Sequence, residues 1–247
     1  MTAPFLYRAY AVRTCYPRDK AERLLDAIID QQLSWRTRFK DNRRNFIGRA
    51  LFEGDDLVVK VPRARNQGWY QRMRTWWQPG EAARRYASMR RLEALGLSGT
   101  PALLMAEKRC AGMIVDSFFA YRYVDGRLAG PGDERVLCHV VARLHKAGYV
   151  RRDCKPSNFV IAEGSGEACF IDFRLTRPRW WRGFRIDLER CQFLMNMPTA
   201  REWMEPERAR RWPFRLARCC QSAGYNLNKW RRAGSRRLRG RTDEHTQ

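Results

Sequence analysis

Three segments of the chain have the spacing of apolar positions, or the end signals, that predict helices. The first is residues 17–33, where the apolar positions three and four apart are Ala21, Leu24, Leu25, Ile28 and Ile29. The second is residues 81–95, followed by Gly96, a residue type that commonly closes helices. The third begins at Pro131 and carries Val136, Val140, Val141 and Leu144 on one face.

Apolar and β-branched runs between these segments predict strands. We expect them near residues 35–40, 46–53, 56–62, 102–107 and 113–119, with two more at 160–161 and 169–171 around a turn. Residues 1–16 have strand character, and residues 64–80 predict a loop or a short helix. A chain of 247 residues that is 44% hydrophobic can bury a sizeable core. We therefore expect one α+β unit of two lobes, a strand-rich 1–120 and a mainly helical 121–247.

A group of polar residues follows the third predicted helix. Asp153, Lys155 and Asn158 lie on one loop, and Asp172 comes fourteen positions after Asn158. An Asp, an Asn five residues later and an Asp-Phe further on have the spacing of a phosphoryl-transfer loop. Asp153 is suited to accept a hydroxyl proton and Lys155 to meet a γ-phosphate, while Asn158 and Asp172 offer the oxygen ligands that Mg²⁺ prefers. The alternative is a chance loop with a capping Asp and an exposed Lys.

The second half of such a site is expected on an upstream strand. Lys60 stands within the apolar run Leu57–Val61, where burying an ammonium group is costly without a partner. It therefore predicts a specific role, holding the α- and β-phosphates of ATP, unless it is an edge-strand Lys that faces water. Residues 121–124 lie between the two lobes, where Tyr123 would bring adenine against backbone groups.

These motifs resemble the protein-kinase-like superfamily and, within it, the bacterial lipopolysaccharide core kinases of the heptose-kinase type. The resemblance covers about Asn45 to Met197, including V-V-K-V at Lys60, R-R-L-E-A-L-G-L at 90–97, the run at 144–161, F-I-D-F at 170–173 and R-I-D-L-E-R at 185–190. It implies a bilobal fold, with a small antiparallel-sheet N-lobe and a mainly helical C-lobe, and ATP and Mg²⁺ as cofactors. The residue roles that it implies are Asp153 as base, Asn158 and Asp172 as metal ligands, Lys60 as an ATP contact and Asp187 as a brace of the catalytic loop.

Three departures from the superfamily pattern concern the nucleotide side. No Gly-rich loop is visible in the expected hairpin at 38–46, which has only Gly48 nearby. Arg174 replaces the Gly after Asp-Phe, which disfavours a flipping activation switch because Gly best tolerates positive φ. The acid that should pair with Lys60 is displaced: Arg85 stands at the position expected from Gly96. Glu81, one helical turn earlier, is the candidate partner of Lys60.

Charge points to polyanionic partners. The chain has a net charge of +23, which fits nucleic acid, an anionic membrane or a phosphorylated glycolipid. Two clusters of Arg and Trp, at 69–77 and 174–185, favour an acceptor or membrane surface over ordinary aromatic packing under solvated Arg. A basic tail at 231–241, expected to be disordered, would add attraction to an anionic leaflet or to RNA without specificity.

The compartment is expected to be the cytoplasm. Eight scattered Cys without a C-x-x-C pair suit reduced thiols and not a zinc site. The sequence has neither the pattern of a signal peptide at its start nor an apolar run long enough to span a membrane.

We therefore expect a kinase that phosphorylates a sugar of the lipopolysaccharide inner core, a heptose, at the cytoplasmic face of the inner membrane, with no specific nucleic acid as partner. One alternative is a kinase of the same fold that acts on Kdo, an aminoglycoside-like sugar or a protein Ser/Thr. The other is a non-catalytic pseudokinase that binds anionic membrane or RNA.

Overall fold

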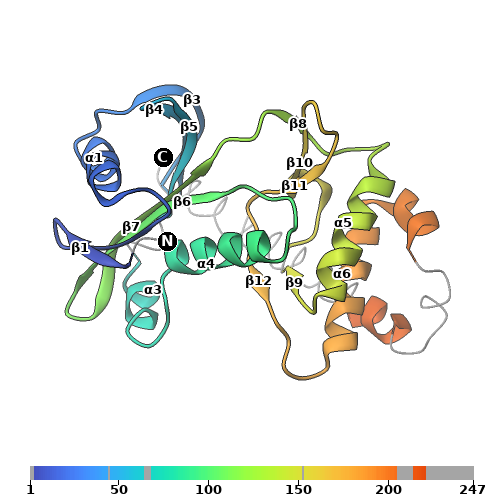
Figure 1. The fold of residues 1–247 in the computed structure, drawn as a ribbon. Helices are drawn as coiled ribbons and strands as arrows, with labels where there is room; N and C mark the ends of the chain where they lie inside the picture. Colours follow the sequence, from blue (N-terminus) through green and yellow to red (C-terminus); the bar gives the residue numbers. More distant parts are fainter. Residues whose placement is uncertain (1–2, 44, 64–67, 152, 205–213, 221–247) are drawn as a thin grey trace, which may run out of the picture. The chain divides into compact units, whose positions relative to one another are not determined.

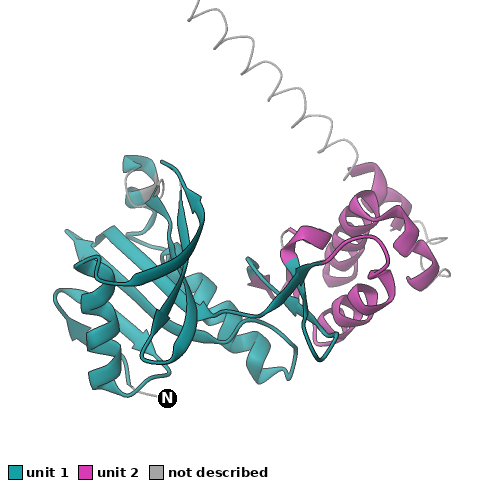
Figure 2. Ribbon diagram, turned by 90° about the horizontal axis from the view of Figure 1, so that it is seen from above, with its two compact units in different colours: residues 1–128, 159–174 teal, residues 129–158, 175–247 magenta. Residues whose placement is uncertain are grey.

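The computed structural model describes residues 3–43, 45–63, 68–151, 153–204 and 214–220. The chain forms two compact units, which Figure 2 distinguishes by colour. Unit 1 comprises Met1–Leu128 and Phe159–Arg174, and unit 2 comprises Ala129–Asn158 and Leu175–Gln247. Compared with the expected division at residue 120, the first unit continues to Leu128 and also takes in the hairpin after Asn158.

Unit 1 is built on a seven-stranded antiparallel sheet in the order β1-β2-β6-β7-β5-β4-β3. Figure 1 shows these strands with the helices that accompany them. The strands are β1 (Phe5–Tyr7), β2 (Tyr10–Thr14), β3 (Ser34–Asp41), β4 (Phe46–Phe52), β5 (Asp55–Val61), β6 (Ala102–Cys110) and β7 (Met113–Arg122). The helices given by the described residues of this unit are α1 (Arg18–Ile29), α3 (Trp69–Arg74) and α4 (Glu81–Ala94).

The two faces of this sheet meet different helices because side chains alternate along a strand. Leu57 and Val59 of β5 belong to the hydrophobic core that also contains Leu24 and Leu25 of α1. Val58 and Lys60 must then face the opposite side. That side is covered by α4, which packs against β6 and β7. The alternation thus directs Lys60 towards the face on which α4 lies.

A second, three-stranded sheet completes unit 1. It consists of β8 (Gly126–Leu128), β10 (Phe159–Ala162) and β11 (Ala168–Phe170), with β10 in the middle and both pairings antiparallel. Phe159 pairs with Phe170 across the hairpin, and their rings lie 4.9 Å apart. Phe173 adds a third buried ring against Phe170. This aromatic cluster anchors the segment that carries Asp172.

Unit 2 is mainly helical in its described part. It contains α5 (Glu134–Lys146), α6 (Arg182–Asn196), the 3-10 helices η1 (Pro156–Asn158) and η2 (Pro198–Trp203), and a helix over 214–220. Two short strands, β9 (Val150–Arg151) and β12 (Leu175–Thr176), pair antiparallel. Cys191, Phe214 and Ala217 form a small core that joins α6 to the last helix.

The expected fold class is confirmed: the chain is α+β, with a large antiparallel sheet in one unit and mostly helices in the other. The structure differs from the sequence expectation at residue 121, because Tyr121 and Arg122 extend β7 and Leu57 of β5 pairs with Arg122. No helix among the described residues has the length and apolar character needed to cross a membrane.

Candidate active site

Lys60 is a buried cation whose partner is an aspartate. It is only 6% exposed, and its Nζ lies 2.5 Å from Oδ1 of Asp172. Burial lowers the pKa of Lys60 from the ordinary value of 10.5, and the charge of Asp172 acts in the opposite direction. The edge-strand alternative is wrong on geometry, since β5 lies between β7 and β4 within the sheet.

Arg85 of α4 joins the same carboxylate. Its Nη1 lies 2.7 Å from Oδ1 of Asp172 and donates a hydrogen bond of 3.2 Å to the backbone carbonyl of Phe173. Its other side contacts Glu81 one helical turn earlier, at 3.1 Å. The pairing differs from the one expected: the carboxylate at Lys60 is that of Asp172, and Glu81 pairs with Arg85. The long, forked guanidinium reaches both acids at once.

The backbone of Asp172 adopts the left-handed conformation, with φ of 46°. A non-glycine residue rarely takes this conformation, and such residues gather at functional sites. In the superfamily, the residue of this segment that best tolerates a positive φ is the Gly at the position of Arg174. The structure instead places the positive φ two residues earlier, between the buried anchor of the hairpin and the buried ring of Phe173.

The hairpin between β3 and β4 stands where a Gly-rich loop was expected. Asn42 closes its turn, accepting a hydrogen bond from the backbone N–H of Asn45 through its side chain at 2.9 Å. A Cβ atom on Gly48 would lie 2.6 Å from the ring of Trp35. Gly48 therefore makes room for a neighbouring indole, and this requirement alone accounts for glycine at that position.

Tyr123 follows β7 directly. Its ring stacks with Phe39 at a centroid distance of 6.4 Å, and the guanidinium of Arg49 lies 3.6 Å from its centroid. Its backbone N–H donates to the carbonyl of Asp56. Any adenine contact proposed for Tyr123 would therefore use its ring or its carbonyl.

The loop residues Asp153, Lys155 and Asn158 lie together in unit 2. Lys155 Nζ is 3.1 Å from Oδ2 of Asp153, and both side chains are well exposed. Asn158 is buried and donates through Nδ2 to the carbonyl of Asp153 at 2.8 Å and to its Oδ2 at 3.2 Å. Because the amide nitrogen of Asn158 donates to Asp153, the amide oxygen Oδ1 is the atom of this side chain that can act as a ligand for a cation.

Several buried residues lie on this loop and on the helices α5 and α6. Cys154 is fully buried, and burial raises the pKa of its thiol well above the ordinary range. His145 Nε2 and Glu189 Oε1 form a buried pair at 2.9 Å that joins α5 to α6, and burial raises the pKa of Glu189 although His145 opposes the shift. Asp187, the proposed brace, is also buried on α6. Its full burial makes Cys154 a packing residue.

The structure groups the predicted residues by unit. Lys60, Glu81, Tyr123 and Asp172 belong to unit 1, and Asp153, Lys155 and Asn158 belong to unit 2. Arg85 was noted in the sequence only as an unexpected replacement, and its contacts with Asp172 and Phe173 emerge from the fold. Arg152 and the basic tail at 231–241 lie outside the described residues.

The residue types fit a magnesium ion with nucleotide phosphates. Mg²⁺ commonly takes one or two protein oxygens together with phosphates and water. Asp172 offers a carboxylate whose Oδ1 receives both Lys60 and Arg85. Asn158 offers its amide oxygen. These two side chains would hold the ion.

Comparison with known proteins gives the fold but no close relative. No protein-family model matches the chain, and no curated protein matches it. Among solved structures, one described as WaaP in complex with acyl carrier protein aligns with a TM-score of 0.54 at 16% identity, covering 91% of this chain and 98% of that chain. Another, provisionally assigned as an aminoglycoside phosphotransferase from Ralstonia eutropha, aligns with a TM-score of 0.47 at 12% identity over 79% of this chain and 80% of that chain.

The comparison with solved structures gives the fold of the chain. The likeness to WaaP extends over nearly the whole of both chains, so the protein has the protein-kinase-like fold expected from its motifs. Within that fold, Lys60 lies on β5, Asn158 ends η1 and Asp172 contacts Lys60, and the roles that the resemblance implies for these residues stay predictions.

Proposed function

We propose that this chain is an ATP- and Mg²⁺-dependent kinase that phosphorylates a sugar hydroxyl, that of a heptose, in the inner core of lipopolysaccharide. The observation that carries the proposal is the loop in which Asn158 holds Asp153 and Lys155 lies against the same carboxylate. The choice of a heptose rests on the motifs that resemble the lipopolysaccharide core kinases, and the fold shared with WaaP is compatible with a kinase.

Each polar residue has a role that its chemistry allows. Asp153 accepts the proton of the acceptor hydroxyl, and Lys155 meets the phosphoryl group as a point charge. Lys60 contacts the α- and β-phosphates, and Asn158 and Asp172 hold the metal. When Mg²⁺ is bound, it neutralises part of the charge of the triphosphate.

Chain connectivity supports the two metal ligands. Asn158 immediately precedes Phe159, and Asp172 comes two residues after Phe170. Phe159 and Phe170 pair across the β10–β11 hairpin. The two proposed ligands therefore lie close in the chain to a pair of residues that face each other across the hairpin.

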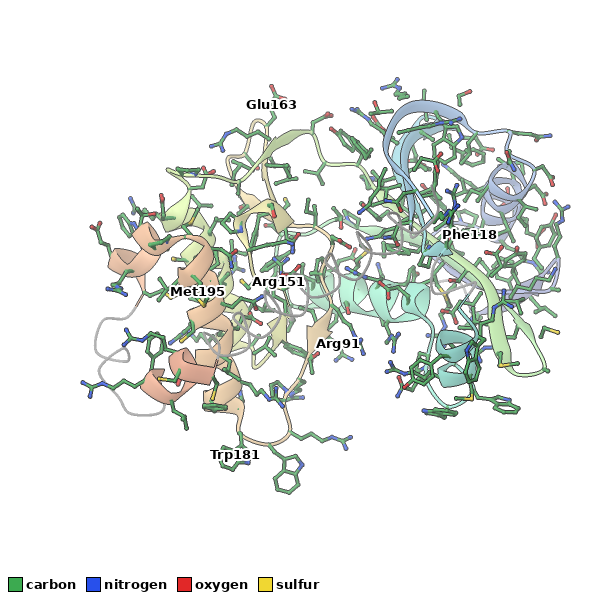
Figure 3. All side chains as sticks on the ribbon, turned by 180° about the vertical axis from the view of Figure 1, so that it is seen from behind. Arg91, Phe118, Arg151, Glu163, Trp181 and Met195 are labelled. Carbon is green, nitrogen blue, oxygen red and sulfur yellow. The ribbon has the colours of Figure 1, made fainter. Side chains whose placement is uncertain are left out.

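The place of action that we propose is the cytoplasmic face of the inner membrane, where an anionic lipid-linked acceptor would be presented. Support comes from large exposed aromatic side chains among arginines in both units. In unit 1 these are Trp69, Tyr70, Trp76 and Trp77, and in unit 2 they are Trp180 and Trp181. Figure 3 shows the indole of Trp181 projecting outward from its loop. Trp and Tyr favour the membrane–water interface.

The acceptor separates this proposal from its nearest rival, a kinase of the same fold acting on Kdo, an aminoglycoside-like sugar or a protein. Labelled ATP is incubated with the protein and fractionated cells. Label in core glycolipid supports the proposal, and label confined to protein or to another sugar contradicts it. A non-catalytic protein would show neither incorporation nor Mg-ATP binding by calorimetry at millimolar nucleotide.

The catalytic assignment predicts the effect of Asp153→Asn. The substitution keeps the shape of the side chain and removes the proton acceptor, so the rate of phosphorylation of core lipopolysaccharide should fall by about 10²- to 10⁴-fold. The matched control is Glu163→Gln, which changes an exposed acid at the tip of the β10–β11 hairpin (Figure 3). A wild-type rate for Asp153→Asn would remove the base from the mechanism.

A further inference from the structure

A groove between α5 and α6 carries an unusual concentration of positive charge. It has a volume of about 360 Å³ and lies entirely within unit 2. The residues that line it are His139, Ala142, Arg143, His145, Lys146, Ile186 and Arg190. The lining thus contains two arginines, one lysine and two histidines and no acidic residue. Asp153, Lys155 and Asn158 are not part of it.

Helix geometry explains how the groove forms. His139, Ala142, Arg143 and Lys146 are spaced by three and four residues, so they share one face of α5. Ile186 and Arg190 are four apart on α6. On the buried side of the two helices, the pair of His145 with Glu189 at 2.9 Å fixes their approach. The positive groups are therefore presented by rigid elements that a buried contact holds in place.

The shape of the groove argues against an ordinary solvated helix face. Here the cations surround a concave space whose floor includes Ala142 and Ile186. Its volume falls at the lower end of the range of small-molecule sites, about 300–1,000 Å³, which exceeds the needs of a bare ion.

The chemistry of the lining selects the ligand. Guanidinium groups bind phosphate with paired hydrogen bonds, and an ammonium group adds a point charge. Among the described residues, the buried Nδ1 of His145 has no hydrogen-bond partner. The apolar floor suits a carbon skeleton. Together these features fit a phosphate ester of a polyol.

We propose that the α5–α6 groove binds a phosphate-bearing polyol, either a sugar phosphate or the head group of a phospholipid. This inference does not depend on the proposed kinase activity. It concerns a binding site and predicts affinity whether or not the protein transfers phosphate.

The test measures binding to the full-length protein by calorimetry. The soluble probes are glucose 1-phosphate, glycerol 1-phosphate and glucose, and the lipid probes are vesicles of phosphatidylcholine with and without phosphatidylglycerol. The groove variant is Arg143→Ala/Lys146→Ala. Its matched control, Arg135→Ala/Arg201→Ala, removes the same charge from exposed positions of unit 2 that do not line the groove. Thermal unfolding checks that both variants fold.

Wild type and control should bind the phosphate esters and should not bind glucose, and the groove variant should bind them at least about tenfold more weakly, since two charge-assisted contacts are lost. If only phosphatidylglycerol vesicles show this pattern, the head group is the ligand. Equal binding by the groove variant and wild type, or no binding to either kind of phosphate ester, would overturn the proposal.

Discussion

At the scale of single residues, Arg85 gives the nucleotide side of the site its particular character. The position was expected to hold the acid that pairs with Lys60. A cation there forces a different solution, in which Asp172 receives both Lys60 and Arg85, and Glu81 balances Arg85. The four groups carry two positive and two negative charges, so the partly buried cluster is neutral without a ligand. Mg²⁺ bound at Asp172 would add positive charge to this neutral cluster, and the nucleotide phosphates would offset it.

This arrangement predicts that Arg85→Met destabilises the protein. The substitution removes the bonds to Asp172 and to the carbonyl of Phe173 and leaves Glu81 without its cation at a largely buried position, where losing a bond to a charged group costs about 1–3 kcal/mol. The matched control is Arg91→Met on the exposed face of the same helix, for which we expect a change within about 0.5 kcal/mol. Urea unfolding measures both. Equal midpoints and slopes for the two variants would contradict a structural role for Arg85.

The sequence predicted the individual residues of the site better than their partners. Lys60 was recognisable because an ammonium group within a β-branched run requires a reason. Asp172 and Asn158 were recognisable by spacing. Their contacts were not, because the reach of Arg85 from α4 to Asp172 joins residues 87 positions apart along the chain, and no local pattern records such a pair. The packing of Trp35 against Gly48 was not predicted for the same reason.

At the scale of elements, helix α4 is positioned by a strand. Its N-cap residue is Gly80, which has no side chain to cap the first turn. The carboxylate of Glu107 on β6 does so instead, accepting a hydrogen bond from the backbone N–H of Ala83 at 3.0 Å. A Cβ atom on Gly80 would lie 2.1 Å from that carboxylate oxygen, so glycine is required for the approach. This contact with β6 fixes the position of the N-terminus of α4, the helix that carries Glu81 and Arg85.

We therefore predict that Glu107→Ala lowers the free energy of unfolding by about 1–3 kcal/mol, because a buried helix N-terminus loses its acceptor. Glu107→Gln keeps an acceptor oxygen and should cost less than half as much. Chemical denaturation followed by circular dichroism measures both. If alanine and glutamine are equally costly, or if neither has an effect, Glu107 does not act as the cap.

The sequence located this helix but could not show what begins it. Gly96 and the helical pattern gave residues 81–95, and the structure gives Glu81–Ala94. The strands β4, β5, β6 and β7 were placed to within three residues because their apolar runs are bounded by turns. The capping group comes from a strand that follows the helix, and only the folded sheet brings the two together. Periodicity thus predicts elements, whereas their mutual support is a tertiary property.

At the scale of the whole molecule, charge and exposed aromatic rings favour a surface over a soluble partner. The net charge of +23 would attract any polyanion. Nucleic acid would account for the charge but not for tryptophans that are 62–74% exposed at Trp69, Trp76 and Trp77. An anionic bilayer accounts for both, since basic groups near it contribute about 1 kcal/mol each and indoles settle at its interface.

This reasoning predicts binding to vesicles that has two separable components. Co-sedimentation with phosphatidylglycerol-containing vesicles should be strong at low salt and should weaken as salt screens the charges, while pure phosphatidylcholine should bind far less. Trp69→Ala/Trp76→Ala/Trp77→Ala should weaken binding at least about tenfold and leave the salt dependence in place, because the cations remain. The control is Leu6→Ala/Phe39→Ala, which removes exposed apolar groups elsewhere in unit 1. If the triple variant binds like wild type, the aromatic cluster does not contribute to vesicle binding and charge alone accounts for it.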